Sequence, residues 1–267
     1  MLKDITLGQY FPIDSALHKL DSRTKILLLI LDIVAIFIAQ SLYSYILVVA
    51  FTVFIMFVSK VPVKTYFKGL KPILFVIIFT AILNMFLTDG RDFPIFGYSV
   101  GITVEGIQTA VKMAVRLILL IISSSALTYT TSPMVLTDGI EKLLKPLSKI
   151  GFPAHELAMM MSIAIRFIPT LTEETDKIIK AQQARGADFD TGSIFKRAKA
   201  LIPMLVPLFI SAFRRADDLA IAMESRCYRG GDNRTRMNEI RFTIADLWGW
   251  IVFMLFFAAV IVLNILF

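Results

Sequence analysis

Five stretches with few charged residues alternate with polar segments along the chain. They cover residues 26–39, 42–58, 72–87, 113–127 and 247–267. The last is 21 residues long, close to the roughly 20 residues that a helix needs to cross about 30 Å of hydrocarbon. The shorter runs can also span if flanking Lys and Tyr side chains reach the interface and the fourth helix begins near Glu105. The pattern predicts an all-α integral membrane protein with about five transmembrane helices.

The composition supports this fold class. Of the 267 residues, 57% are hydrophobic and 18% are charged, and the mean hydropathy is +0.73. A soluble domain has about 45 to 50% apolar and about 25% charged residues. A single cysteine, Cys227, excludes an internal disulfide, and residues 1–24 carry polar groups throughout, unlike a cleaved signal peptide.

Basic residues predict the orientation in the membrane. The segment before the first span and the loop after the second span are rich in Lys and Arg, whereas residues 88–104 contain only Arg91. By the positive-inside rule the basic segments are cytoplasmic. We therefore expect a four-helix membrane bundle over residues 1–131, a cytoplasmic region over 132–241 and a last span over 242–267. This order places the N-terminus inside and the C-terminus outside the cell.

The predicted cytoplasmic region is strongly basic. Residues 141–241 hold 17 of the 28 Lys and Arg residues against 12 acids, a local net charge of 17 − 12 = +5. Such a segment suits anionic lipid or an acidic protein, although positive-inside bias alone also explains it. Without interleaved aromatic residues or a known binding motif, the charge does not indicate nucleic-acid binding.

Two long helical patterns in this region are too apolar for water and too short to cross a membrane. Residues 200–213 contain no charge and include Pro203 and Pro207, and the pattern over 153–186 contains Pro169 and three consecutive methionines. We expect two amphipathic helices bent at these prolines. The methionines suit either an adaptable partner surface or core packing.

Both helical patterns end in a similar way. Ala181 is followed four residues later by Arg185, and Ala222 by Arg226. A cation near a helix C-terminus and a following glycine are ordinary stop signals. A generic stop would not require an alanine four residues earlier in both helices, so the repetition indicates a shared role.

These features together resemble the transmembrane coupling subunit, or T component, of energy-coupling factor transporters. Residues 14–29, "DSALHKLDSRTKILLL", are similar to the family's approach to its first span. The family's two Ala-Arg-Ser or Ala-Arg-Gly motifs match two short segments: Ala184, Arg185, Gly186, and Ser225, Arg226, Cys227. The second segment departs at both flanks and keeps only the arginine. Residues 226–246 also follow the family's run into the last span.

The resemblance implies a function and a set of partners. The two helices would be coupling helices, with each arginine inserted into one of two ABC ATPase subunits, either identical or different. A small membrane protein that binds a vitamin or metal ion, the S component, would occupy the opposite apolar surface. We expect that contact to include Met159, Met160, Leu205 and Phe209. ATP and magnesium would be bound by the ATPases.

The residues themselves favour no enzyme and no resident cofactor. The chain has no Gly-Lys dipeptide and hence no phosphate-binding loop of the G-x-x-x-x-G-K kind. His155 and Glu156 would need a second histidine at position 159 to form a zinc-protease helix, but Met159 stands there. A G-x-S-x-G elbow is also missing from the sequence. His18 is expected to order the N-terminal segment.

Asp32 supports an alternative class, a self-sufficient channel or secondary transporter. An acid in the middle of a transmembrane helix is a candidate functional group. Arg116 in the fourth span lies at a depth that suits an ion pair with Asp32. A conventional ABC permease is a third possibility, but such a subunit docks through one coupling loop, whereas this chain has two arginine tips.

Overall fold

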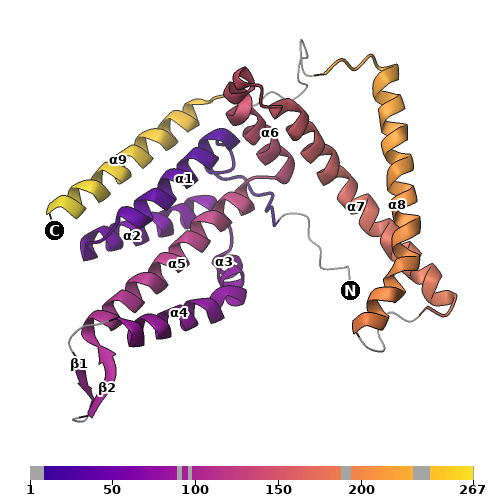
Figure 1. Cartoon of the computed structure of the whole chain (residues 1–267). Helices are drawn as coiled ribbons and strands as arrows, with labels where there is room; N and C mark the ends of the chain where they lie inside the picture. Colours follow the sequence, from indigo (N-terminus) through magenta and orange to yellow (C-terminus); the bar gives the residue numbers. More distant parts are fainter. Residues whose placement is uncertain (1–8, 89–91, 96–97, 188–193, 231–240, 267) are drawn as a thin grey trace. The chain divides into compact units, whose positions relative to one another are not determined.

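The computed structural model describes residues 9–88, 92–95, 98–187, 194–230 and 241–266. Within this part, the chain forms two compact units (Figure 1). One contains residues 9–139 and 241–266, and the other contains residues 140–187 and 194–230. Each unit is described by itself.

The first unit is a bundle of apolar helices. Its helices are α1 (Ser22–Ile38), α2 (Leu42–Ser59), α3 (Val63–Leu70), the short 3-10 turn η1 (Lys71–Ile73), α4 (Leu74–Leu87), α5 (Val104–Thr130) and α9 (Ile244–Leu266). By length and composition, four described segments are able to cross a membrane: α2, Val63–Leu87, α5 and α9. Helix α1 has 17 residues, a length of about 26 Å, and is slightly shorter than these four. The all-α membrane fold predicted from the sequence is confirmed.

Two features of the bundle differ from the prediction. A two-stranded antiparallel hairpin, β1 (Asp92–Ile95) and β2 (Tyr98–Thr103), stands between α4 and α5 where a plain loop was expected. Lys64 and Lys68 lie in the amphipathic helix α3 instead of in a loop. The buried side chain of Tyr66, which is 1% exposed, explains why this basic segment is helical: a helix lets one face pack while the lysines face outward.

The core of the bundle lies among α1, α2, α5 and α9. Buried residues from all four helices form one cluster: Ala35, Ile36, Ala39, Val48, Leu119, Phe253, Phe256 and Val260. The ring of Phe51 on α2 stacks on that of Phe256 on α9, with centroids 3.9 Å apart. Because α1 contributes to the same cluster as three span-length helices, it packs as an integral member of the bundle.

The second unit consists mainly of two long helices. Helix α6 (Pro133–Leu144) crosses the boundary between the units and leads into the 3-10 segment η2 (Lys145–Ile150). Helix α7 (Ala154–Ala184) has 31 residues and α8 (Ile194–Ser225) has 32, so α8 extends well beyond the predicted run 200–213. Both helices continue through their internal prolines.

Helices α7 and α8 cross in opposite directions (Figure 1). Gln182, near the end of α7, hydrogen-bonds to the carbonyl of Pro203 in the first half of α8. Further along α8, Arg215 pairs with Glu174, which precedes Gln182 by eight residues on α7. Later residues of α8 therefore contact earlier residues of α7, so the two helices are antiparallel.

Candidate functional site

The C-terminus of α7 is closed by a Schellman motif. The amide of Gly186 donates to the carbonyl of Gln183 (2.9 Å), and the amide of Ala187 donates to the carbonyl of Gln182 (3.0 Å). Gly186 has φ +87°, the left-handed conformation that this motif requires and that glycine adopts without steric penalty. Arg185 is the C-cap residue, so its side chain leaves the helix at its last turn.

The C-terminus of α8 has the same backbone geometry with different residues. Cys227 donates to the carbonyl of Glu224 (2.8 Å), and Tyr228 donates to that of Met223 (3.0 Å). Cys227 takes the place of the glycine, with φ +55°. A left-handed non-glycine residue is uncommon and strained by roughly 1 to 2 kcal/mol. The second motif therefore keeps the close backbone turn although its flanking residues differ, and Arg226 occupies the same C-cap position as Arg185.

The two arginines lie far apart and face solvent. Both residues are exposed, and neither guanidinium has a hydrogen bond or ion pair within the part of the chain that the structure describes. Arg185 ends α7, whereas the turn containing Arg226 lies beside the start of the same helix, at Met159. At 1.5 Å per residue this separation is about 40 Å. One antiparallel pair thus presents a cation at each end.

Tyr228 fixes the second arginine tip in a way that the sequence did not reveal. Its hydroxyl hydrogen-bonds with His155 Nε2 (3.3 Å) and contacts Met159 Sδ (3.1 Å). His155 Nδ1 in turn lies 3.1 Å from Glu141 Oε1. These contacts join residues as much as 73 positions apart, so the only sequence signal was a tyrosine two residues after Arg226.

A hollow of ≈ 650 Å³ lies beside this tip. Three guanidinium-bearing residues, Arg166, Arg226 and Arg229, line it together with apolar side chains such as Phe167 and Met223. Guanidinium groups stay protonated and offer five donors each, so such a hollow favours carboxylates and carbonyl oxygens.

An ion pair holds α7 and α8 together about two-thirds of the way along each helix. Glu174 Oε2 lies 2.6 Å from Arg215 Nη2, and the other carboxylate oxygen accepts a hydrogen bond from Ser211. The Ser211 hydroxyl first, and then the charge of Arg215, lower the pKa of Glu174 below its ordinary value. The crossing is thus stabilised by the ionised carboxylate.

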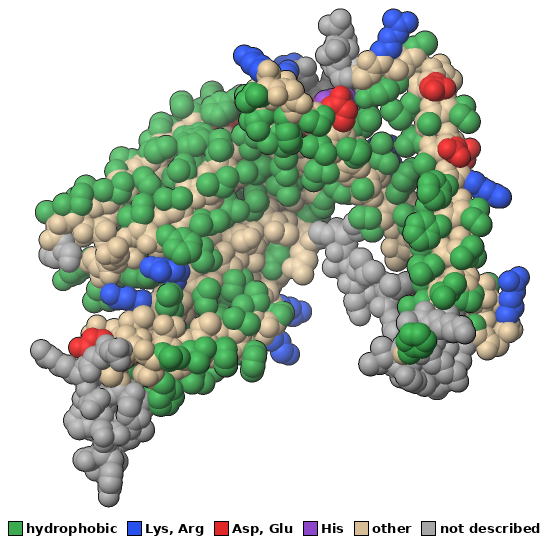
Figure 2. Space-filling model, viewed as in Figure 1, with side chains coloured by type: hydrophobic (Ala, Val, Ile, Leu, Met, Phe, Trp, Pro, Cys, Tyr) green, Lys and Arg blue, Asp and Glu red, His purple; other side chains and the backbone are tan. Residues whose placement is uncertain are grey.

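The face of α8 opposite its contacts with α7 is apolar and exposed. Exposed hydrophobic side chains follow it at helical spacing: Leu201, Ile202, Leu205, Val206, Phe209, Ile210 and Phe213. Figure 2 shows hydrophobic side chains along the length of this helix. No described side chain of α8 is buried. An apolar stripe of this length marks an interaction surface.

The structure separates the predicted S-component residues into two kinds. Leu205, Phe209 and Met160 are exposed by 41%, 61% and 53%. Met159 is half-buried and contacts the hydroxyl of Tyr228, so it supports the second tip.

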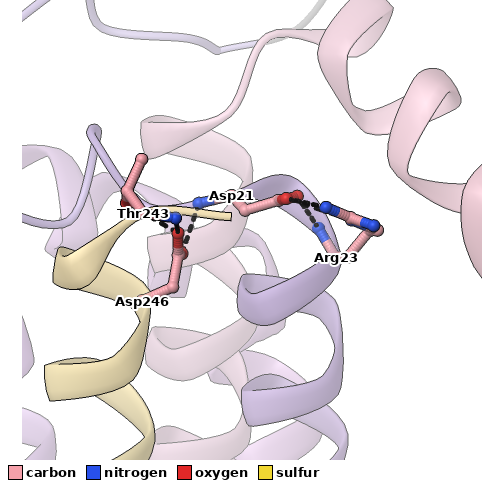
Figure 3. Close-up of polar contacts among 4 residues, drawn as sticks. All are labelled: Asp21, Arg23, Thr243 and Asp246. Atoms are coloured by element: carbon pink, nitrogen blue, oxygen red, sulfur yellow. Dashed lines mark hydrogen bonds and ion pairs between the residues drawn. The ribbon is translucent and has the colours of Figure 1, made fainter. Parts of the chain in front are cut away.

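The N-terminal motif forms a polar clasp at one end of the membrane bundle (Figure 3). Asp21 caps α1 by accepting from the amide of Arg23 (2.9 Å), and it pairs with the Arg23 guanidinium. The amide of Asp21 donates to Asp246 Oδ1 (2.7 Å), while the amide and hydroxyl of Thr243 donate to Oδ2. The clasp joins the first helix to the last, which explains these polar residues beside apolar runs.

Two other residues of this motif secure the segment before α1. His18 Nε2 donates to the carbonyl of Phe11 (2.9 Å) and Nδ1 accepts from Ser15 (2.6 Å), as expected for a structural histidine. Burial lowers the pKa of His18, which favours the neutral ring. Lys25 Nζ donates to the carbonyls of His18 (3.3 Å) and Thr130 (2.9 Å) and to the Thr131 hydroxyl (3.2 Å).

The expected ion pair between Asp32 and Arg116 does not form. Arg116 donates to the Tyr45 hydroxyl (3.0 Å) and lies over the ring of Phe37, 5.3 Å from its centroid. Asp32 instead faces Ser123, seven residues further along α5. Seven residues correspond to about 10 Å along a helix, so the two charges lie at different levels of the bundle.

The fold and the two matched arginine turns define a class: a multi-pass membrane subunit with a pair of long amphipathic helices. Comparisons with known proteins identify the family. The CbiQ family, described as cobalt transport protein, matches residues 14–237. Proteins named energy-coupling factor transporter transmembrane protein EcfT are 57% identical over 247 residues in Ruminiclostridium cellulolyticum and 58% identical over 247 residues in Clostridium kluyveri, covering 92% of each chain.

The chain belongs to the EcfT transmembrane components of the CbiQ family. It is therefore a non-catalytic, integral membrane subunit of an energy-coupling factor transporter. Membership implies a complex with ATPases and an S component, in which ATP is hydrolysed by the partner subunits. The alternative of a self-sufficient channel or secondary transporter is set aside by this finding. Among the described residues, no group of His, Cys, Asp and Glu side chains is arranged to hold a metal ion.

Proposed function

We propose that this chain transmits ATP-driven movement from two ABC ATPase subunits, identical or different, to an S component that carries a vitamin or metal ion. Arg185 and Arg226, each with its flanking residues, are the two ATPase contacts. The observation that carries the proposal is the matched Schellman geometry at opposite ends of one antiparallel helix pair. Two exposed cations about 40 Å apart suit two separate partner subunits.

The chemistry of arginine suits this role. A guanidinium group remains charged and holds several acceptors in a planar fork, so it keeps its contacts while the partner subunit rotates. An arginine that only complements the helix dipole contributes about 0.3 to 1 kcal/mol, whereas truncating one side of a desolvated charge pair costs about 2 to 5 kcal/mol. The two roles therefore differ measurably.

The bare apolar face of α8 is the proposed S-component contact. Leu205 and Phe209 lie at the centre of this face, and Met160 on α7 adds a flexible apolar side chain. Leu205→Asp or Phe209→Asp should release the S component before the ATPases, because the new charge is left unpaired in an apolar interface. Arg214→Asp is the matched control, because Arg214 is exposed and lies nine residues, or two and a half turns, after Leu205, on the opposite side of α8. Loss of the ATPases with retention of the S component would contradict the assignment.

The proposed topology has five spans, with α1 as the first. Residues 1–131 form the four-span bundle, residues 132–241 are cytoplasmic, and residues 242–267 return the C-terminus to the outside. The basic loops support this orientation. A Ser193→Cys variant that also carries Cys227→Gly should not react with an impermeant thiol reagent added to intact cells. Labelling from outside would overturn the orientation.

The central experiment is the double variant Arg185→Glu, Arg226→Glu. It should remain folded in the membrane but lose both ATPases and all uptake, because both contacts become repulsive. The measurements are ATPase co-purification and substrate uptake in the same cells. Lys180→Glu and Arg214→Glu, which reverse exposed charges on α7 and α8 away from the tips, are the matched controls and should retain both functions. If the double variant bound ATPases and transported normally, the arginines would serve only to end their helices, and the proposal would be wrong.

A further inference from the structure

The membrane bundle contains a cavity whose lining includes none of the residues proposed to contact the ATPases or the S component. Its volume is ≈ 420 Å³, and it is lined by α1, α2, α5 and α9 together with the segment before α1. The cavity is partly open, since Phe54 and Trp248 in its wall are exposed. The wall is almost entirely apolar and rich in aromatic side chains, among them Phe51, Phe54, Trp248 and Phe253. A cavity of this kind fits a drug-sized or lipid-like molecule.

Two polar groups in this cavity have no partner. Asp32 is 3% exposed, and both of its carboxyl oxygens lack a hydrogen bond within the described part of the chain. The Ser123 hydroxyl, on a residue that is 5% exposed, lacks one as well, because the two groups face each other without adequate hydrogen-bond geometry. A buried polar group without a partner is destabilising and is retained where it serves binding or catalysis.

Among the described residues that line this cavity, the one cation is not available to Asp32. Lys25 also lines it, but its ammonium group already donates to three oxygens, those of His18, Thr130 and Thr131. An ammonium group has three donors, so none is left. An unpaired carboxylate is very unfavourable in apolar surroundings, and the neutral acid is favoured there. A neutral acid both donates and accepts one hydrogen bond.

We propose that this cavity is an intramembrane binding site for a neutral amphiphile that carries a hydroxyl group on a long apolar chain. The hydroxyl hydrogen-bonds with Asp32 and Ser123, and the chain lies against Phe51, Phe54 and Trp248. An acyl chain without a polar group fills the same space but leaves all three oxygens unsatisfied. The hydroxyl therefore determines the specificity of the site.

Trp248 provides a direct readout. The chain has two tryptophans, so Trp250→Phe leaves Trp248 as the only one, and it lines the cavity. The full-length protein is reconstituted in phosphatidylcholine vesicles and titrated with bromodecanol or bromodecane, whose bromine quenches tryptophan emission. Quenching is plotted against the mole fraction of each probe in the membrane, so that partitioning into lipid cancels.

Bromodecanol should quench Trp248 saturably, with half-saturation at a mole fraction at least tenfold lower than for bromodecane. Asp32→Leu should abolish this preference, whereas Asp32→Asn should keep it, since an amide both donates and accepts in the same place. Ser123→Ala should reduce the preference severalfold. The Asn variant also controls for folding, because it differs from Asp by one atom.

Three outcomes would overturn the proposal. Equal quenching by the two probes in the parent protein would mean that the cavity only takes up lipid tails. A preference that survives Asp32→Leu would place the hydroxyl elsewhere. Loss of the preference in Asp32→Asn, with unchanged thermal unfolding, would show that the hydroxyl needs an ionised carboxylate and would overturn a site built on the neutral acid.

Discussion

The two arginine turns share a backbone and differ in what holds them. At the end of α7, the residues after Arg185 are Gly186 and Ala187, which have no polar side chain, so the backbone bonds alone close the turn. At the end of α8, Cys227 is strained and Tyr228 is attached to His155 and Met159. The backbone geometry is the common requirement, and the means of enforcing it differ.

Each turn has to place its arginine at the end of the helix and has to be held in that conformation. The left-handed residue places the arginine at the last turn of its helix, which glycine achieves without strain and cysteine only with it. The tyrosine contact offsets that strain at the second turn by tethering the residue that follows. Substitutions at the two turns should therefore have unequal effects even though the arginines are equivalent.

Charge reversal at one arginine should have the largest effect. Arg185→Glu and Arg226→Glu should each weaken one ATPase contact by about 2 to 5 kcal/mol, at least tenfold in affinity, and leave the other contact intact. Native mass spectrometry of the purified complex should then detect particles with one ATPase. If either single variant lost both subunits, the two contacts would not be independent.

Substitution of the left-handed residues should have opposite effects at the two turns. A Cβ added at Gly186 would meet no atom within 4 Å, so Gly186→Ala introduces only backbone strain, about 1 to 2 kcal/mol. Cys227→Gly removes that strain and should be neutral or slightly stabilising, because the greater freedom of unfolded glycine offsets part of the gain. ATPase affinity and thermal unfolding of the complex measure both. Equal losses for the two variants would refute the assigned geometry.

Removal of the Tyr228 hydroxyl should affect the second turn only. Tyr228→Phe deletes the hydrogen bond to His155, a contribution of about 1 kcal/mol, and keeps the aromatic ring. In the Arg185→Glu background, where only the second contact remains, ATPase affinity should fall severalfold. In the Arg226→Glu background it should not change. An equal fall in both backgrounds would assign Tyr228 to general stability.

The smallest effect should come from the ion pair between Glu174 and Arg215, which joins the two helices that carry the turns. Because the pKa of Glu174 is lowered in the folded protein, its contribution is fully present above the ordinary glutamate pKa of about 4.3 and is lost as the pH falls through the lower folded value. This partly exposed pair contributes at most a few tenths of a kcal/mol. The fall in thermal stability from about pH 6 to about pH 4 should be slightly smaller in Glu174→Gln than in the parent. Both ATPase contacts should respond alike.

The sequence predicted the parts of this fold that depend on local pattern. Apolar runs located the membrane helices, and basic residues marked the polar segments between them. The apolar run was predicted to begin at residue 72, but the helical span begins nine residues earlier, at residue 63. The added residues are basic and still helical, because their side chains project from a helix whose other face is buried around Tyr66. Charge alone does not distinguish such a helix from a loop.

The two helix ends were predictable from their arginines, whereas the contacts that support them were not. Repetition at residues 181–186 and 222–227 identified the two turns. The contact between Tyr228 and His155 depends on the antiparallel crossing of two helices, which no local pattern encodes. Similarly, Asp32 and Arg116 were plausible partners by depth alone, and only the register of α1 against α5 showed that Asp32 faces Ser123.

The antiparallel arrangement of α7 and α8 also has a consequence for symmetry. Two identical ATPases related by a two-fold axis would present the same groove twice. A single chain has no such axis, and its two turns carry Gly186 in one place and Cys227 with Tyr228 in the other. Even identical ATPases would then occupy inequivalent positions, so each contact can change by mutation without altering the other. Such an arrangement permits the genes of the two ATPase subunits to diverge while one coupling chain serves both.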